Sequence, residues 1–204
     1  MTAEQGAGGE PRVGPRIGAA SKAGRKAFKG FGPKGYRIRM MEPGEAQQLL
    51  AIERRAEATL IALGKTKLSD APKPSIGEFV RFLVEHEVFV AEEKRSGEAV
   101  GFVAARDLGE LYWISELSVD PDHQRRGIGR SLVSAVLERA RWFQHRAVGL
   151  TTYGDIPVGA PFYRRLGFAA VPDADCPPWL HERKRAETPP GSLGATRSVM
   201  IRWL

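Results

Sequence analysis

Cysteine and long apolar runs are what this sequence lacks most clearly. Cys176 is the single cysteine, which excludes an internal disulfide and a cysteine-rich zinc site. The sequence has no run of about 18 apolar residues, the length that a membrane helix needs, and its N-terminus has no apolar segment of the secretory type. We therefore expect a protein of the reducing cytoplasm that contacts no membrane and binds no metal.

Residues 1–34 have no hydrophobic period and abundant glycine. Such a segment cannot bury enough apolar surface to offset the entropy of ordering, so we expect a disordered tail, followed by one domain over residues 35–204. Residues 1–37 hold eight basic and two acidic residues, which is +6 of the net charge of +7. Contact of this tail with nucleic acid stays open, but without regularly spaced aromatic residues a solvated extension is the preferred interpretation.

The most informative stretch runs from residue 109 to residue 131. Residues 111–119 are rich in aromatic and branched side chains, which predicts a buried strand. Pro121 ends this strand because proline lacks the N–H that a strand ladder needs. A polar turn with two glycines follows. From Ile128 onward apolar residues recur every four positions, which predicts a helix that extends to about residue 143.

The junction of strand, glycine turn and helix favours an anion site. The first backbone N–H groups of a helix have no partner within the helix, and the helix dipole adds partial positive charge there. Gly127 and Gly129 let an anion approach the backbone closely, and Arg125, Arg126 and Arg130 add charge. We therefore predict that the turn binds a diphosphate; the alternative is an ordinary turn with a solvated basic rim.

The turn matches neither of the two best-known phosphate loops. A dinucleotide-binding Gly-x-Gly-x-x-Gly would need glycine where Leu132 stands, and the sequence has no P-loop motif. Residues 124–129 read Gln-Arg-Arg-Gly-Ile-Gly and resemble the acyl-CoA signature of the GNAT N-acetyltransferases, Gln/Arg-x-x-Gly-x-Gly/Ala. Residues 162–168, Phe-Tyr-Arg-Arg-Leu-Gly-Phe, resemble a second signature of that family, and the resemblance extends over residues 36–204.

The resemblance implies an α/β (α+β) GNAT fold. In that fold helices flank a mixed, mostly antiparallel sheet of about seven strands that splays between its fourth and fifth strands, and periodicity predicts the matching order β-α-α-β-β-β-α-β-α-β-β. Ser75 and Glu78 form a capping-box pattern that predicts the start of the second helix. The expected strands are residues 36–41, 88–91, 100–105, 111–119, 147–151, 168–171 and 196–204; the expected helices are residues 45–63, 76–86, 127–143 and 161–167; residues 172–195 are expected to be an irregular insertion with a helical turn at 181–187.

The resemblance also implies how acetyl-CoA would bind as co-substrate. Its pantetheine would lie between the splayed strands and bond to the backbone of Leu117, Ser118 and Val119. Its pyrophosphate would lie in the glycine turn, which consists of Gln124, Arg125, Arg126, Gly127, Ile128, Gly129, Arg130 and Ser131. The implied reaction is direct transfer of an acetyl group from the thioester to a primary amine in a ternary complex.

Two catalytic residues are expected on the same basis. The attacking amine must lose a proton, and the departing thiolate must gain one. Tyr163 matches the position of the family's general acid; the alternative is a core tyrosine. Glu116 is the candidate base, because a carboxylate inside an apolar strand is costly to bury unless it is paired or has a raised pKa. A structural ion pair is the alternative for Glu116, and an expected bulge leaves open which face of the sheet it occupies.

The acceptor is expected to be a small, cationic amine. Glu53 and Glu57 stand one helical turn apart and would attract such a molecule, unless they belong to a solvated helix face. Tyr153 and Asp155 belong to a stretch, residues 151–161, that resembles the acceptor-side loop of small-molecule GNAT enzymes. A peptide N-terminus or a lysine is an alternative acceptor. A regulatory module that binds acyl-CoA without turnover is the alternative of another class, and a homodimer is among the oligomeric states left open.

Overall fold

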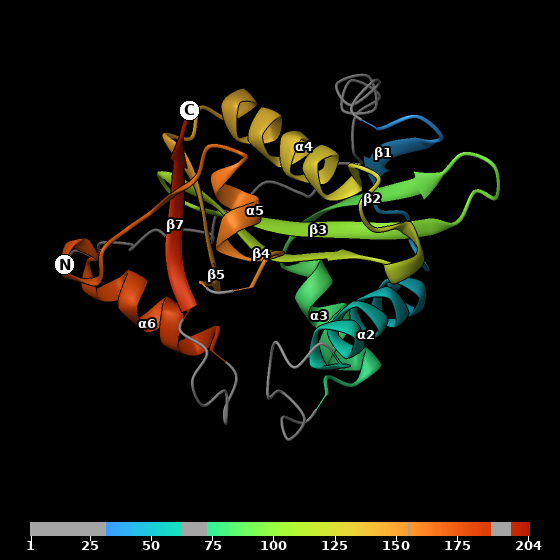
Figure 1. Cartoon of the computed structure of the whole chain (residues 1–204), viewed down its shortest axis with the longest axis horizontal. Coiled ribbons are helices and arrows are strands. Elements are labelled where there is room, and N and C mark those ends of the chain that lie inside the picture. Colours follow the sequence, from blue (N-terminus) through green and yellow to red (C-terminus); the bar gives the residue numbers. More distant parts are fainter. Residues whose placement is uncertain (1–31, 63–72, 155, 189–196) are drawn as a thin grey trace, which may run out of the picture.

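The computed structural model describes residues 32–62, 73–154, 156–188 and 197–204. Within these residues the chain forms a seven-stranded sheet of order β1-β2-β3-β4-β5-β7-β6, with helices on both faces (Figure 1). This is the mixed α/β architecture that the sequence predicts. The tail expected over residues 1–34 lies almost wholly outside the described residues.

The helices and strands follow one another along the chain in the expected order. The strands are β1 (Tyr36–Met40), β2 (Glu87–Glu93), β3 (Ala99–Leu108), β4 (Leu111–Val119), β5 (Ala147–Tyr153), β6 (Ala169–Ala170) and β7 (Arg197–Trp203). The helices are α2 (Ala46–Ala62), α3 (Ile76–Val84), α4 (Ile128–Trp142), α5 (Ala160–Arg164) and α6 (Pro178–Ala186), with short 3₁₀ turns at η2 (Pro121–His123) and η3 (Asp173–Asp175).

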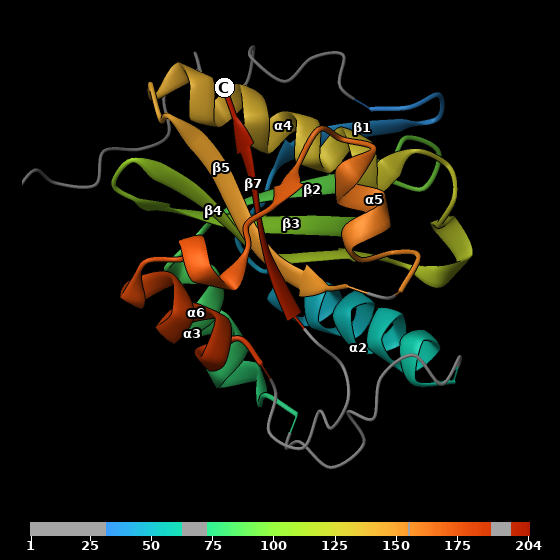
Figure 2. The same cartoon turned by 60° about the vertical axis from the view of Figure 1, so that its left-hand side comes forward.

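The helices form two layers, one on each face of the sheet (Figure 2). On one face α4 and α5 pack over the strands, and Leu132 of α4 is fully buried there. On the opposite face α2 and α3 cover the half of the sheet from β1 to β4, where Leu49 packs with Phe102. α6 covers the other half of that face, with Leu180 packed against Trp113 of β4.

The parallel pairing of β4 with β5 is short. It joins residues 111–114 to residues 147–150 and then stops. Beyond Leu150, β5 continues along β7 until Tyr153 lies opposite Arg197. β4 continues along β3 until Val119 lies opposite Gly101. The two strands therefore diverge halfway along their length, which confirms the splay expected between the fourth and fifth strands.

A β-bulge lies at the point where β4 and β5 diverge. Ala104 lies opposite Glu116 and Ala105 opposite Ile114, so Ser115 is an extra residue in β4. An extra residue shifts the alternation of side chains by one position. Ile114 belongs to the core beneath α4, and without the bulge Glu116 would face the same way. Glu116 instead shares the face of Ala104, which packs with α2 and α3.

His86, just after α3, contacts the bulge from the same side of the sheet. Its Nδ1 lies 2.6 Å from the carbonyl oxygen of Phe82, and its Nε2 lies 2.9 Å from Oγ of Ser115. A carbonyl oxygen can only accept, so Nδ1 carries the hydrogen and Nε2 accepts from the serine hydroxyl. Burial lowers the pKa of His86, which favours this neutral form and stabilises the bulge.

Residues 172–195 are more regular than the sequence suggests. Their described part contains η3 and the nine-residue helix α6, rather than an irregular insertion with a single helical turn. Leu180 is the buried residue of this helix. A helix with one apolar anchor shows no hydrophobic period, and for that reason the sequence pattern fails to predict it.

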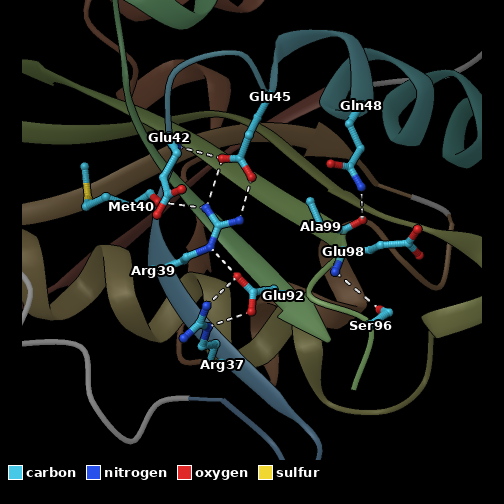
Figure 3. Close-up of polar contacts among 10 residues, drawn as sticks. All are labelled: Arg37, Arg39, Met40, Glu42, Glu45, Gln48, Glu92, Ser96, Glu98 and Ala99. Atoms are coloured by element: carbon cyan, nitrogen blue, oxygen red, sulfur yellow. Dashed lines mark hydrogen bonds and ion pairs between the residues drawn. The ribbon is translucent and has the colours of Figure 1, made fainter. Parts of the chain in front are cut away.

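A network of ion pairs joins β1, β2 and the start of α2 (Figure 3). Glu92 is 5% exposed and accepts hydrogen bonds from Arg37 at 2.9 Å and Arg39 at 2.6 Å. Arg39 also donates to both carboxylate oxygens of Glu45, just before α2, at 2.9 and 2.5 Å. Burial alone would raise the pKa values of Glu92 and Glu45, but the arginines outweigh it and both pKa values are lowered. The network thus sets where α2 begins on the sheet.

Arg39→Met should lower the free energy of unfolding by about 3 kcal/mol at neutral pH, because it leaves Glu92 and Glu45 without their shared partner. A carboxylate whose pKa is lowered by folding contributes stability above its unfolded pKa and loses that contribution as the pH falls through the folded value. In urea denaturation the difference between variant and wild type should therefore shrink from about pH 5 to about pH 3.

The matched control is Arg146→Met, which breaks an exposed pair with Glu110. This variant should cost less than about 1 kcal/mol. Equal losses of stability in the two variants would contradict the role given to Arg39.

Candidate active site

The turn before α4 has the backbone geometry of an anion cradle. Gly127 is the N-cap residue of α4 and has φ 84°, a left-handed conformation that glycine adopts without strain. Arg125 also has a positive φ, of 62°. No side chain of the described residues caps α4, so the N–H groups of its first turn are directed at the space beyond the helix end.

Gly129 serves packing as well as access to the backbone. A Cβ atom placed on Gly129 would lie 3.4 Å from Cζ of Phe162 and 4.0 Å from Cγ2 of Val119. A Cβ atom would therefore be in ordinary van der Waals contact with both side chains, and a side chain longer than alanine would press on α5 and on the end of β4. The two signature segments of the sequence therefore meet in space at this glycine.

Side chains of the turn hold its shape. Gln124 donates from Nε2 to the carbonyl oxygen of Val119 at 3.0 Å. Arg126 donates to the hydroxyl of Tyr36 at 2.9 Å and to the carbonyl oxygen of Asp122 at 3.0 Å. Ile128 is 1% exposed, so its backbone is the part that can contact a ligand. Of the remaining predicted residues, Arg125 and Arg130 are exposed at the surface and the N–H of Ser131 donates to Gly127 at 3.1 Å.

The backbone at the end of β4 is placed to meet a ligand between the strands. Leu117, Ser118 and Val119 pair with β3 on one side. They lie beyond Ile114, the last residue that pairs with β5. Main-chain groups on their β5 side are therefore outside the ladder, and such groups need another partner when buried.

Glu116 lies beside this backbone. Its Oε1 accepts a hydrogen bond of 2.8 Å from Oγ of Ser118. Burial raises the pKa of Glu116, while the hydrogen bond from Ser118 and the positive charge of Arg197 act against that rise. A pKa raised in this way is the direction that suits a carboxylate acting as a proton acceptor.

Glu53 and Glu57 of α2 lie within electrostatic range of Glu116. Oε2 of Glu53 is buried and has no hydrogen-bond partner among the described residues. Burial, and then the negative charges of Glu116 and Glu57, raise the pKa of Glu53 to about 7. Glu57 forms an ion pair of 3.1 Å with Lys73. The fold thus brings the three predicted carboxylates together, although they come from separate elements.

Tyr163 of α5 reaches the same site from the other face of the sheet. It is 8% exposed and packs edge-on against Phe162 and Phe168, with ring centroids 5.0 and 5.6 Å away. Burial and the charge of Glu116 raise the pKa of Tyr163, and the charge of Arg197 lowers it. Tyr163 is therefore protonated at neutral pH and lies within electrostatic range of Glu116.

Arg197 is a site residue that the sequence does not reveal. It donates to Oγ1 and to the carbonyl oxygen of Thr151 at 3.1 and 3.0 Å. Its guanidinium carbon lies 4.9 Å from the ring centroid of Tyr153, which places that predicted residue beside the site. Asp155, the other predicted loop residue, lies outside the described residues. An arginine at the start of the last strand belongs to no motif, so only the pairing of β7 with β5 brings it here.

The described part of the chain contains no group of three or more histidine, cysteine, aspartate or glutamate side chains with the geometry of a metal site. Among these residues, no helix combines the length and apolar character that a bilayer crossing requires.

Comparison with protein families matches residues 84–170 to the model of an acetyltransferase (GNAT) domain. These residues are similar to a GNAT acetyltransferase domain. The matched residues include β4, the glycine turn and α5, so this finding covers both signature segments and the strands that diverge between them.

Two curated relatives carry acetyltransferase names. An uncharacterized N-acetyltransferase of Methanocaldococcus jannaschii is 35% identical over 94 residues, which is 41% of this chain and 39% of the relative. A mycothiol acetyltransferase of Saccharomonospora viridis is 28% identical over 169 residues, which is 75% of this chain and 52% of the relative. The chain thus spans about two fifths to one half of the length of these relatives.

Solved structures share the GNAT fold at low identity. N-acetylglutamate synthase from Neisseria gonorrhoeae, complexed with coenzyme A and N-acetyl-glutamate, aligns with TM-score 0.61 at 18% identity over 83% of this chain and 35% of that one. The ribosomal-protein-S18-alanine N-acetyltransferase from Escherichia coli aligns with TM-score 0.58 at 17% identity over 82% and 93%. These similarities support the fold alone.

Glu53→Gln should make stability less dependent on pH between about pH 5 and pH 8. Folded Glu53, with a pKa of about 7, holds a proton where the unfolded carboxyl, with the ordinary value of 4.5, has lost it. The stability that this group contributes is therefore present at low pH and is lost as the pH rises through about 7. Relative to wild type, the variant should gain about 1–2 kcal/mol on going from pH 5 to pH 8.

Urea denaturation at each pH measures this gain. Glu138→Gln is the control, because Glu138 lies on the exposed side of α4 in a surface pair with Arg141. A difference between Glu53→Gln and wild type that stays constant with pH would show that Glu53 titrates at its ordinary value.

Proposed function

We propose that the protein transfers an acetyl group from acetyl-CoA to a primary amine of a small, cationic acceptor, by direct attack in a ternary complex. The observation that carries this proposal is the divergence of β4 from β5 after Ile114, with the glycine turn at one end of the opening and Glu116 and Tyr163 beside it. Acetyl-CoA supplies the acetyl group as an activated thioester.

The chain's own residues fit coenzyme A. The left-handed Gly127 and the uncapped start of α4 suit a pyrophosphate, and a Cβ atom at residue 129 would already be in van der Waals contact with Phe162. The backbone of Leu117, Ser118 and Val119 lies outside the β4–β5 ladder and can bond to the amides of pantetheine. The same backbone can donate to a developing oxyanion.

Glu116 and Tyr163 supply the two proton transfers. A raised pKa allows Glu116 to take a proton from the acceptor's ammonium, directly or through water, which leaves a neutral amine able to attack. Tyr163 keeps its proton at neutral pH and can give it to the departing sulfur. Burial in a closed site strengthens both interactions.

The carboxylates beside the site suit a positively charged acceptor. Glu53, Glu57 and Glu116 place three carboxyl groups close enough to interact electrostatically, and a bound cation would favour their ionised forms. The buried Oε2 of Glu53 needs a donor, and an ammonium group of an acceptor supplies one. The acceptor classes to compare are small amines, peptide N-termini and lysine side chains. Binding of acetyl-CoA without turnover of any of them would define a binding module.

Acetyl-CoA at a hundredfold excess over its dissociation constant should stabilise the protein by about 2.7 kcal/mol, because it binds the folded chain alone. The melting temperature measures this effect, with acetate as the control ligand. An unchanged melting temperature would remove both the enzyme and the binding module. A panel of small amines, amino-terminal peptides and lysine peptides, followed by release of free thiol, then separates turnover from binding.

Glu116→Gln should lower kcat about a hundredfold, because the amide cannot take a proton from the acceptor. The affinity for acetyl-CoA, measured by calorimetry, should stay unchanged, since the glycine turn is intact. The acidic limb of the kcat/KM profile should disappear. The control is Glu98→Gln in the exposed turn between β2 and β3. A wild-type pH profile in Glu116→Gln would exclude Glu116 as the base.

A further inference from the structure

Glu187, the C-cap residue of α6, joins the two diverging strands. One carboxylate oxygen accepts from Nε1 of Trp113 on β4 at 2.8 Å, and the other accepts from Oγ1 of Thr151 on β5 at 2.6 Å. Trp113 belongs to the last part of the β4–β5 ladder, and Thr151 is the first residue of β5 beyond it. The carboxylate therefore spans the two strands where their backbone pairing ends.

The hydrogen bond to Glu187 fixes the direction in which the hydroxyl hydrogen of Thr151 points. A hydroxyl carries one hydrogen, and a carboxylate such as Glu187 can only accept it. The lone pairs of Oγ1 are then left for a donor, and Nε of Arg197 lies 3.1 Å from this oxygen. A second nitrogen of Arg197 donates to the carbonyl oxygen of Thr151 at 3.0 Å. Glu187 thus orients the group that holds the arginine.

Three contacts hold the guanidinium of Arg197 in place. Two hydrogen bonds hold it to Thr151, and the ring of Tyr153 lies 4.9 Å away on its face. A planar guanidinium held through two donors and a ring has little freedom to move. Its charge therefore acts from a constant position on the groups around the opening.

The groups that face Glu116 come from several elements. α2 contributes Glu53 and Glu57, α5 contributes Tyr163, and β7 contributes Arg197. His86 after α3 is neutral in its contact with the neighbouring Ser115. Lys73 and Arg54 oppose the negative charge at Glu53, and Arg197 supplies positive charge at Glu116. It favours the ionised forms of both Glu116 and Tyr163.

We propose that Arg197 is a positioning residue for acetyl transfer, and that α6 acts on the site by holding Arg197 through Glu187 and the Thr151 hydroxyl. This inference rests on the proposed function. Glu116 must be ionised before it takes a proton from the amine, and Tyr163 becomes negative when its proton passes to the sulfur. A fixed positive charge stabilises the carboxylate before transfer and the phenolate after it.

The variants that test this role change the charge and the hydrogen bonds of residue 197 separately. Arg197→Gln removes the charge, and Arg197→Lys keeps the charge but loses the planar guanidinium that makes two hydrogen bonds to Thr151. Glu187→Gln leaves one acceptor oxygen for two donors and also removes the ion pair of Glu187 with Arg183, and Thr151→Val removes the hydroxyl at nearly constant volume. Lys184→Ala is the control, since the partners of the Lys184 ammonium are the carboxylate oxygens of the exposed Asp173 rather than Glu187.

Carbon NMR titration of the side-chain carboxyls, with the Glu116 signal assigned by its loss in Glu116→Gln, follows the charge effect without turnover. The pKa of Glu116 should rise by about one unit in Arg197→Gln, because a favourable charge is lost. Arg197→Lys, Glu187→Gln and Thr151→Val should give smaller rises, and Lys184→Ala none. The acidic limb of kcat/KM should move to higher pH by the same amounts, with kcat/KM about tenfold lower in Arg197→Gln near that limb.

A double-mutant cycle separates this role from simple stabilisation. Glu187→Gln should add no further rise to Arg197→Gln if α6 acts through the arginine. An unchanged pKa of Glu116 in Arg197→Gln, or an equal effect of Glu187→Gln with and without the arginine, would overturn the inference. Failure of wild type to acetylate any amine in the panel would refute the proposed function, while the NMR titration would still report on Arg197.

Discussion

The backbone pairing between β4 and β5 ends after Ile114 and Leu150, and the remainder of the site depends on that ending. A strand that loses a neighbour exposes main-chain N–H and C=O groups that need new partners. The bulge at Ser115 lies at the same point and turns Glu116 away from the apolar core beneath α4. One local irregularity in β4 therefore coincides with both the end of the β4–β5 ladder and a carboxylate beside it.

Local signals explain what could be predicted from the sequence. The strand and helix on either side of the glycine turn lie where their residue patterns place them, and Ser75 forms the expected capping box. Each of these features depends on residues within a few positions of one another. The direction of Glu116 could not be predicted, because one extra residue in β4 reverses the alternation and no composition signal marks it. Arg197 and Glu187 could not be predicted either, since they meet Thr151 only through sheet order and the docking of α6.

The carboxylates of α2 are held near Glu116 by contacts elsewhere. Like charges repel, so the fold must fix Glu53 and Glu57 in place by other means. Arg39 ties Glu45, just before α2, to β1 and β2, while Leu49 and Ile52 pack into the core on the next turns. Because the start of the helix is fixed, the position of Glu53 is fixed as well. Its pKa is raised by this placement, and the ion pairs of Arg39 offset the free-energy cost of burying a carboxyl group beside other carboxylates.

In the proposed reaction, binding of a cationic acceptor would favour the ionised form of the carboxylate that acts as the base. An ammonium group near Glu53 and Glu57 would neutralise the charges that raise the pKa of the site, so the carboxylates would lose protons as the acceptor binds. Arg197 acts in the same direction before the acceptor arrives, and it is held by its hydrogen bonds to Thr151 of β5. The arginine can therefore keep part of Glu116 ionised without occupying the place of the acceptor. A neutral amine would gain no such effect, because it brings no charge to lower the pKa of Glu116. This asymmetry favours cationic acceptors even where neutral ones fit the same space.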